Sequence, residues 1–231
     1  MLKKERFRHF LDYFIQHYPD PKTELRFGNP YELLVAVILS AQCTDKRINQ
    51  ITPALFERFP TPDSLAASTV DEVLLYIRSV SYPNNKAKHL LGMARLLLSD
   101  YGGEVPATVE ALQTLPGVGR KTAHVITSVI YNQPTMAVDT HVFRVSRRLG
   151  LATQTANTPL AVEKQLMAHI PQQYVPKAHH WLILHGRYVC TARIPKCGEC
   201  PLTGSCRYYE TYVAGNKSGA EIPLIEIPTP L

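Results

Sequence analysis

A lysine directly after a glycine-rich turn is the first residue of this sequence that could do chemistry. Lys121 follows two closely spaced glycines, Gly117 and Gly119, at the expected start of a helix. Glycines allow positive φ angles and let a phosphate approach the backbone, and the N–H groups at a helix start attract anions. Such a turn can hold a DNA backbone without reading its sequence. We therefore predict DNA contacts from Gly117, Val118, Gly119, Arg120 and Thr122.

Lys121 is the candidate nucleophile. The first turn of a helix disfavours a cation because the helix dipole is positive there, and Arg120 acts in the same direction. Both effects favour a neutral amine that could attack an electrophile at neutral pH. Two simpler interpretations stay open. A Gly-x-Gly turn often joins two helices for structural reasons alone, and a surface lysine could hold a phosphate without reacting.

Asp139 is the candidate acid or base. It stands where a helix N-cap belongs, because Val142, Val145 and Leu149 follow at helical spacing. A capping role is the simpler explanation, and it is compatible with chemistry. A carboxylate kept ionised by helix N–H groups could stabilise a cation or accept a proton. Between Glu110 and Glu163 it is the one carboxylate, in a chain of net charge +6. This charge favours a polyanionic partner, although a solvated basic face would give the same pattern.

The cysteines indicate a metal centre near the end of the chain. Cys43 stands alone, and the other four follow a C-x6-C-x2-C-x5-C pattern. An odd number of cysteines without a secretion signal favours reduced thiols or bound metal over disulfides. Zinc is the general candidate for Cys-x2-Cys pairs, but only one such pair exists here, and the spacing fits a [4Fe-4S] cluster better. The expected ligands are Cys190, Cys197, Cys200 and Cys206, and Cys43 is expected to be a packed thiol.

The elements that must position these residues are expected to be helices throughout. Of the 231 residues, 45% are hydrophobic and 19% charged, as in a globular protein. The longest apolar run, Leu33 to Leu39, is too short to cross a membrane, and no secretion signal is evident, so we expect a cytoplasmic protein. Helical periodicity predicts an all-α fold with short connections. The expected helices are 31–43, about 70–80, 90–98, 108–114, 120–131, 140–149, 159–170 and 176–188.

Taken together, these motifs resemble the endonuclease III family of helix-hairpin-helix DNA glycosylases and AP lyases. The segments LPGVGRKTA, AVDTHVFRV and HHWLILHGRYVC precede the four-cysteine loop in the order of that family, and the resemblance runs from about Thr23 to Tyr208. It implies two helical domains. Residues 22–133 would form a six-helix barrel with the hairpin, residues 1–21 and 134–207 an iron-sulfur domain, and residues 208–231 a tail. Within the tail, Ile222 to Ile227 alternates weakly, but its prolines disfavour a strand.

The resemblance also implies a reaction and a partner. Lys121 would attack C1′ of a flipped nucleotide, expel an oxidised pyrimidine and form a Schiff base, and β-elimination would then break the strand. Asp139 would assist base departure and proton transfer, while His141 and Arg144 would contact the DNA. The partner would be damaged double-stranded DNA at the nucleoid. The protein would bind it as a monomer, and no membrane partner is expected.

Two further DNA contacts follow from the resemblance. Gln42 matches the residue that enters the space left by the flipped nucleotide, although it could also be a polar residue that ends a helix. The loop at Tyr82 supplies a second wedge. There the chain departs from the family pattern, with Ser81, Tyr82 and Pro83 in place of glycine, a large apolar residue and tyrosine. The departure puts the preference for the opposite base in doubt.

Two other classes of protein share part of this pattern. A related adenine glycosylase needs a glutamate at the position of Ile38 and lacks the nucleophilic lysine. A non-catalytic DNA-binding or redox-sensing protein would share the hairpin and the cluster but would form no covalent bond at Lys121. His179, His180 and His185 lack the spacing of a metal site and are expected to support the core or the backbone.

Overall fold

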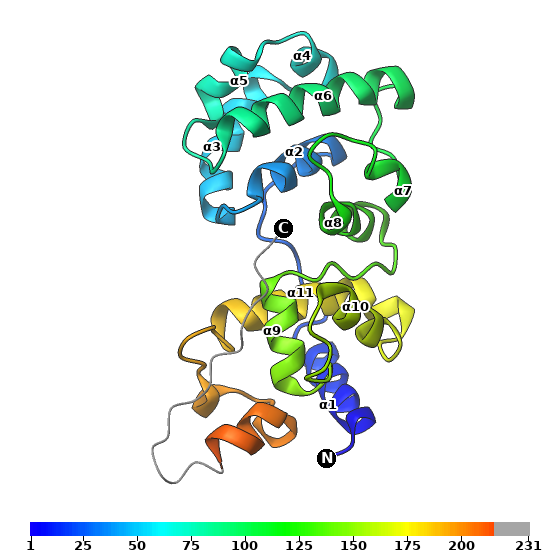
Figure 1. Cartoon of the computed structure of the whole chain (residues 1–231), viewed down its shortest axis with the longest axis vertical. Helices are drawn as coiled ribbons and strands as arrows, with labels where there is room; N and C mark the ends of the chain where they lie inside the picture. Colours follow the sequence, from blue (N-terminus) through cyan, green and yellow to red (C-terminus); the bar gives the residue numbers. More distant parts are fainter. Residues whose placement is uncertain (215–231) are drawn as a thin grey trace. The chain divides into compact units, whose positions relative to one another are not determined.

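The computed structural model describes residues 1–214, and it confirms the all-α prediction: these residues form helices and turns without a strand (Figure 1). The chain divides into two compact units. We call residues 23–133 the central unit. The split unit joins residues 1–22 to the chain from residue 134 onward. None of the helices in the described part is long and apolar enough to span a membrane.

The central unit is built around one buried helix. Every residue of α2 from Leu33 to Leu39 is buried, and α2 packs against α3, α6 and α8. Its N-terminus is fixed by Asn29, whose side chain accepts a hydrogen bond from the Glu32 N–H at 2.9 Å. The helices of this unit are α2 (Pro30–Ser40), α3 (Asp45–Arg58), α4 (Pro62–Ala66), α5 (Val70–Ile77), α6 (Pro83–Tyr101), α7 (Val109–Leu112) and α8 (Arg120–Tyr131).

Helix α2 ends earlier than its apolar pattern predicts. The sequence suggested a helix to Cys43, but α2 stops at Ser40 because Gln42 adopts a left-handed conformation with φ 57°. The buried Lys86 supplies donors to the last carbonyls, with its Nζ 2.8 Å from the Leu39 oxygen and 2.6 Å from the Ala41 oxygen. A cation at a helix C-terminus is favourable, and here it replaces the next turn.

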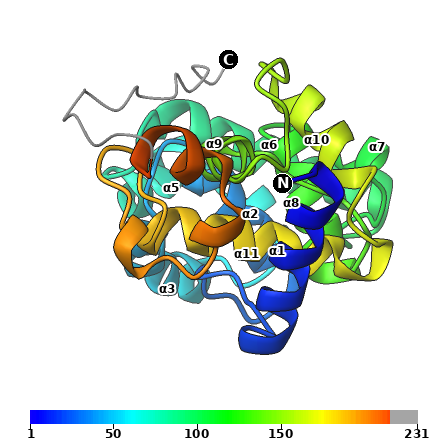
Figure 2. The same ribbon diagram turned by 90° about the horizontal axis from the view of Figure 1, so that it is seen from below.

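The split unit has an aromatic core. Phe10 and Phe14 of α1 pack on Trp181 of α11, and the Trp181 indole donates to the Tyr18 carbonyl at 2.7 Å. These contacts hold the beginning of the chain to its later part. The elements are α1 (Lys3–His17), α9 (Thr140–Leu149), α10 (Pro159–Met167), η1 (Gln172–Tyr174), α11 (Val175–Tyr188), η2 (Cys197–Glu199), η3 (Thr203–Ser205) and a π-helical turn, η4 (Tyr209–Val213). Figure 2 views this unit from below, with the segment 190–213 beside α1 and α11.

Three helices were not singled out from the sequence. Helix α1 carries four buried residues, among them Arg6, whose polar side chain interrupts the apolar pattern. Helix α3 contains Pro53, and α4 has only five residues, so neither shows a long hydrophobic repeat. At the other end of the chain, Tyr208 is buried in the split unit's core. The weak alternation at 222–227 lies outside the described residues.

Candidate functional site

The hairpin of the central unit depends on a glycine at position 117. Its φ is 82°, and a Cβ there would come within 3.0 Å of the His89 Cβ. The left-handed conformation and the close approach each exclude a larger residue. The Val118 N–H donates to the Leu115 carbonyl at 3.1 Å, and the Val118 side chain is buried. Val118 therefore anchors the turn in the core and leaves its two glycine neighbours exposed.

Helix α8 begins directly after this turn. Gly119 is its N-cap, and a Cβ added there would meet no atom within 4 Å. The helical hydrogen bonds start with the Ala123 N–H, which donates to the Gly119 carbonyl at 3.0 Å. The N–H groups of the first turn therefore precede this ladder, as in anion sites at helix N-termini. Arg120 and Lys121 are exposed in this turn, and Thr122 is half-buried.

Two other exposed residues of the central unit have strained backbones. Gln42 and Tyr82 have φ angles of 57° and 55°, a left-handed conformation that is uncommon for residues other than glycine. Tyr82 is 64% exposed at the N-cap of α6. Cys43 is half-buried against the core, as expected for a packed thiol. Ile38, where an adenine glycosylase needs glutamate, is buried in the core.

Asp139 caps helix α9 of the split unit. Its Oδ1 accepts a hydrogen bond from the Val142 N–H at 2.7 Å, so the capping interpretation is correct. Burial lowers the pKa of the nearby His141, and Arg144 and Arg187 act in the same direction, whereas Asp139 raises it. A Cβ at Gly186 of α11 would lie 3.0 Å from the His141 Cβ. Close packing on α11 therefore fixes the N-terminal turn of α9, with a half-buried carboxylate at its start.

Arg144 departs from the expectation that it contacts DNA. The residue is 3% exposed. Its Nη2 donates to the Gly186 carbonyl at 2.9 Å, and its Nε donates to the Cys190 carbonyl at 3.2 Å. A guanidinium used in this way holds the end of α11 and the first cysteine of the loop. The acceptors lie 42 and 46 residues away in sequence, so no local pattern could reveal this role.

The four cysteines of the loop converge in the split unit. Cys190, Cys197, Cys200 and Cys206 all line one cavity between α11 and the loop. Within residues 1–214, no three His, Cys, Asp or Glu side chains are close enough together to hold a single metal ion. Four cysteine sulfurs around one cavity are the ligand set that a [4Fe-4S] cluster requires.

The electrostatics of these thiols also fits a cationic centre. Burial raises the pKa of Cys206 to about 11, with the negative charges of Cys190 and Cys200 adding to the effect. Burial likewise raises the pKa of Cys197 and Cys200. Four adjacent thiolates are stable only around a positively charged group, which deprotonates coordinating thiols. A bound [4Fe-4S] cluster would supply that positive charge and connect the four cysteines of the loop.

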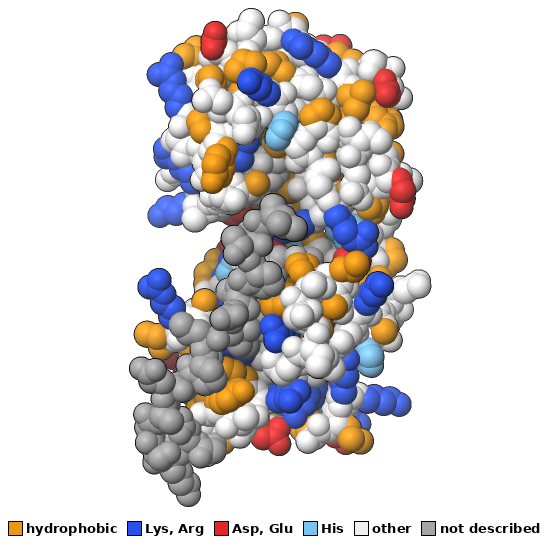
Figure 3. Space-filling view, in the orientation of Figure 1, with side chains coloured by type: hydrophobic (Ala, Val, Ile, Leu, Met, Phe, Trp, Pro, Cys, Tyr) orange, Lys and Arg blue, Asp and Glu red, His pale blue; other side chains and the backbone are white. Residues whose placement is uncertain are grey.

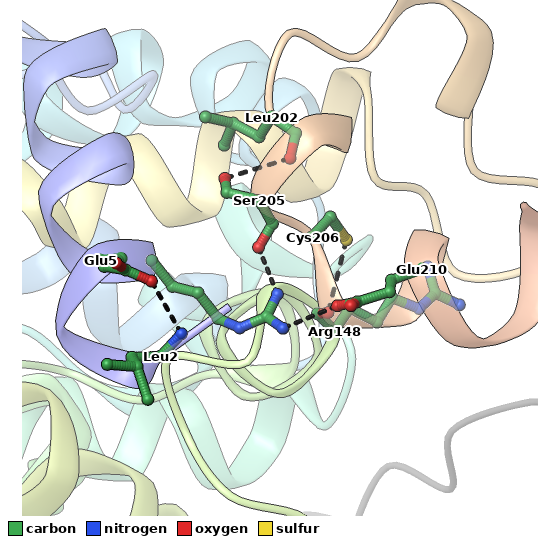
Figure 4. Close-up of polar contacts among 8 residues, drawn as sticks. Leu2, Glu5, Arg148, Leu202, Ser205, Cys206 and Glu210 are labelled. Atoms are coloured by element: carbon green, nitrogen blue, oxygen red, sulfur yellow. Dashed lines mark hydrogen bonds and ion pairs between the residues drawn. The ribbon is translucent and has the colours of Figure 1, made fainter.

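Buried arginines hold the loop from the other side. Arg148, which is 1% exposed, donates to the Thr191 carbonyl at 2.6 Å and the Ala192 carbonyl at 2.8 Å, and its Nη1 lies 3.5 Å from the Cys190 sulfur. Arg6 of α1 donates to the Ser205 carbonyl and pairs with Glu210 at 2.8 Å. In Figure 4, dashed lines join Ser205 and Glu210 to one guanidinium, and a separate line joins the Cys206 sulfur to the Arg148 carbonyl, to which it donates at 3.4 Å. The sequence pattern did not predict that either arginine holds the cysteine loop.

Replacing Arg148 by methionine should loosen the loop and reduce its metal content. The substitution keeps much of the buried volume but leaves the carbonyls of Thr191 and Ala192 without their donor. We expect a loss of about 2–4 kcal/mol of unfolding free energy. Iron content per protein and visible absorbance should fall together with the melting temperature. Arg147→Met on the same helix is the matched control, since the Arg147 guanidinium donates to Gln154 and lies over the Phe143 ring, both outside the loop. Equal iron content in both variants would contradict this role.

The histidines of α11 lie inside the split unit. His179 and His185 are buried, and burial lowers the pKa of His180 to about 4. His185 lies 3.7 Å from the Cys200 sulfur and packs on Phe14. These histidines support the core, as the sequence suggested.

His180 should make the protein less stable in weak acid. Its pKa is about 4 in the folded protein and about 6.5 in an unfolded chain, so the unfolded state takes up the proton first as the pH falls. Stability from this residue is therefore complete above pH 6.5 and decreases by up to about 3 kcal/mol toward pH 4. His180→Gln should melt with a smaller difference between pH 7 and pH 5 than the wild type. Parallel pH dependences in thermal unfolding would argue against a buried neutral imidazole.

The surface shows where the remaining positive charge lies. On the face in Figure 3, Lys and Arg side chains occur on both units, with few carboxylates among them. Arg144 and Arg148 do not contribute to this surface, because both are buried. Part of the basic charge near Asp139 is thus directed toward the cysteine loop instead of solvent.

Comparison with known proteins places these features in one family. Residues 35–172 match the HhH-GPD superfamily of base excision DNA repair proteins, and residues 190–206 match the iron-sulfur binding domain of endonuclease III. The endonuclease III of Rickettsia felis is 47% identical over 198 residues, which are 86% of this chain and 92% of that protein. The chain belongs to the endonuclease III family. Its relatives include the Bacillus subtilis endonuclease III, which is 44% identical over 90% of this chain and 94% of its own length.

The solved structures agree with this membership in the endonuclease III family. A trapped endonuclease III–DNA covalent intermediate, an estranged-adenine complex, has a TM-score of 0.85 and 45% identity, covering 91% of this chain and 98% of that one. A non-covalent endonuclease III–DNA complex matches equally well, with a TM-score of 0.85 and 44% identity. The protein is thus a DNA glycosylase and AP lyase of base excision repair that binds DNA and carries a [4Fe-4S] cluster.

Proposed function

We propose that this enzyme removes oxidised pyrimidines from duplex DNA through a covalent bond to Lys121. One observation carries the assignment. Lys121 is exposed in the first turn of α8, two residues after an unobstructed Gly119, in a chain of a glycosylase and lyase family. The first-turn N–H groups and Arg120 would hold a phosphate next to the amine. Arg120 and Thr122, with Gly117 and the backbone of Val118, complete the proposed contact.

The reaction divides into two steps at the sugar. The lone pair of Lys121 Nζ attacks C1′, the bond between C1′ and the base breaks, and the base leaves with that electron pair and takes up a proton. The nitrogen then passes a proton to the ring oxygen O4′, the C1′–O4′ bond breaks with its electron pair left on O4′, and nitrogen forms the double bond of the Schiff base to C1′. Removal of a C2′ proton expels the 3′ phosphate by β-elimination, and hydrolysis of the Schiff base frees the lysine.

Asp139 is proposed to stabilise the cation that develops at the sugar and to transfer protons there. A carboxylate that already caps α9 is fixed in direction, so little reorganisation is needed during the reaction. His141 is proposed to contact the DNA next to it. Arg144 is left out of the proposed contacts, because its guanidinium is used inside the split unit.

Gln42 and Tyr82 are proposed to enter the duplex. Flipping a nucleotide costs a few kcal/mol, and the cost is lower at a damaged pair. Side chains that fill the vacated space offset part of that cost. Both residues are exposed on tight turns of the central unit, and Tyr82 is an aromatic residue that can stack on a base.

We further propose that the enzyme acts on nucleoid DNA in the cytoplasm, as a monomer. Its exposed large hydrophobic residues come from many different elements, and on the face in Figure 3 they are scattered among polar side chains. A stable oligomer usually requires a contiguous apolar patch.

Borohydride trapping tests the proposed reaction. Reduction of the Schiff base should link wild-type protein to duplex DNA that contains thymine glycol, dihydrouracil, an oxidised cytosine or an abasic site, and undamaged duplex should give no adduct. The relative yields would rank the lesions. Binding to every duplex without an adduct or a strand break would favour a non-catalytic DNA-binding protein instead.

A further inference from the structure

Lys86 is a buried lysine that the proposed chemistry does not use. It lies in the first turn of α6 and is 5% exposed. Its ammonium donates to the Leu39 carbonyl at 2.8 Å and the Ala41 carbonyl at 2.6 Å, and it lies 3.9 Å from the Cys43 sulfur. All three donors of the amine therefore have an acceptor in the segment that leads into and out of Gln42. Lysine is rarely buried without such a full set of partners.

Ser81 makes a second connection to the same segment. Its N–H donates to the Cys43 sulfur at 3.1 Å, and its hydroxyl donates to the Gln42 carbonyl at 2.8 Å. Burial alone would raise the pKa of Cys43, but the hydrogen bonds from Ser81 and the charge of Lys86 lower it. Cys43 is therefore a good acceptor between the two partners. Ser81 and Lys86 flank Tyr82 and its helix start, so the contacts join two turns that are 39 residues apart.

The two joined turns hold two of the three left-handed residues other than glycine in the described chain. These are Gln42, Tyr82 and Asn132. Asn132 follows the last residue of α8, where asparagine commonly ends a helix. Gln42 and Tyr82 have no such conformational preference, so a left-handed backbone is unfavourable at both residues. Such strain persists only where the surrounding structure fixes it, and here the surrounding contacts are those of Lys86, Cys43 and Ser81.

We propose that Lys86, Cys43 and Ser81 form a positioning network that joins Gln42 and Tyr82 into one rigid two-pronged element for insertion into DNA. This inference rests on the proposed function, because it requires both side chains to enter the duplex. Water could satisfy the exposed carbonyls of this segment without fixing its direction. A buried ammonium between the two turns fixes the direction of both turns. The two side chains are therefore ordered before the DNA binds. Ser81 begins the second turn, at the position where the family pattern has glycine. Its hydroxyl supplies the hydrogen bond to the Gln42 carbonyl.

A double-mutant cycle measures this connection. Single-turnover excision from thymine-glycol duplex is compared for the wild type, Gln42→Ala, Tyr82→Ala and the double variant. Groups in one network couple, so the double variant should differ from the product of the single effects by about threefold or more. In a Lys86→Met background, the effects of Gln42→Ala and Tyr82→Ala on the excision rate should simply multiply. Fluorescence of 2-aminopurine opposite the lesion reports insertion directly, and its rise should be smaller in Lys86→Met.

Controls separate the coupling from charge, folding and chemistry. Lys88→Met removes an exposed lysine two residues away on α6 and should leave the cycle unchanged. Should Lys86→Met fail to fold, Ser81→Ala removes only the hydroxyl link and should halve the coupling or more. Borohydride trapping on an abasic single strand needs Lys121 but no insertion, so Lys86→Met should trap there like the wild type. The network would be overturned if wild-type trapping were normal and the effects of Gln42→Ala and Tyr82→Ala simply multiplied. It would also be overturned if the coupling between these two substitutions persisted in Lys86→Met. Absence of trapping in the wild type would instead remove the proposed function.

Discussion

Lys121→Ala is expected to abolish the borohydride adduct and to lower strand cleavage at an abasic site by three orders of magnitude or more. The side chain lies in the first turn of α8 and is exposed, so its removal should leave the fold intact. Loss of a nucleophile removes the covalent route altogether, which is why the expected effect is so large. Quenched-flow cleavage and denaturing gels of the reduced complex measure both quantities.

The simpler interpretation of Lys121 predicts a different result. A lysine that only holds phosphate would weaken binding and reduce the salt dependence of the affinity by about one charge. Saturating protein would then restore the adduct. Arg120→Ala is the matched control, because it removes a neighbouring charge of the same turn without removing the amine. Persistence of the adduct in Lys121→Ala at saturating protein would show that another amine is the nucleophile.

Asp139→Asn is expected to slow base excision by about a hundredfold while DNA affinity and stability change little. Asparagine caps a helix as well as aspartate does, so the hydrogen bond to the Val142 N–H can be retained. Only the negative charge and the proton acceptor are lost, and general acid–base groups contribute about 10²–10⁴ to a rate. Single-turnover rates, equilibrium binding and thermal unfolding are measured on the same samples.

The chain offers a matched control for the capping role alone. Thr158 caps α10 in the same unit, where its hydroxyl accepts a hydrogen bond from the Ala161 N–H at 3.2 Å. Thr158→Ala should cost about 1 kcal/mol of stability and leave excision unchanged. If Asp139→Asn instead lowered the melting temperature as much as Thr158→Ala and left the rate intact, Asp139 would be a cap and nothing more.

Local motifs of this protein could be interpreted from the sequence because their partners are close in the chain. The Gly117 turn and the Asp139 cap are completed by atoms within three residues. Their conformations follow from glycine sterics and from N–H groups left over at a helix start, which hold in any fold. The cysteine loop is equally local, since four thiols within seventeen residues can surround one cluster. For the same reason, the all-α class could be predicted from the helical repeat.

The directions of charged side chains could not be predicted in this way. Arg144 and Arg148 look like part of a basic DNA-binding face, yet both point into the split unit and bind carbonyls 42 to 46 residues further along the chain. Lys86 looks like a surface lysine at the start of a helix. In the structure its ammonium donates to carbonyls at the end of α2, which lie 45 to 47 residues earlier in the chain. Composition records the charge of these residues but not which carbonyls lack a partner.

The sequence by itself thus determined the helical class, the hairpin, the cap and a loop of four thiols close enough for one cluster, since each depends on short-range geometry. Only the tertiary structure decided where α2 stops, why Gln42 and Tyr82 share one network, and which arginines hold the loop at the cluster. Those features arise where packed helices leave backbone carbonyls without water. A buried cation is stable there only because several distant segments supply its acceptors at once.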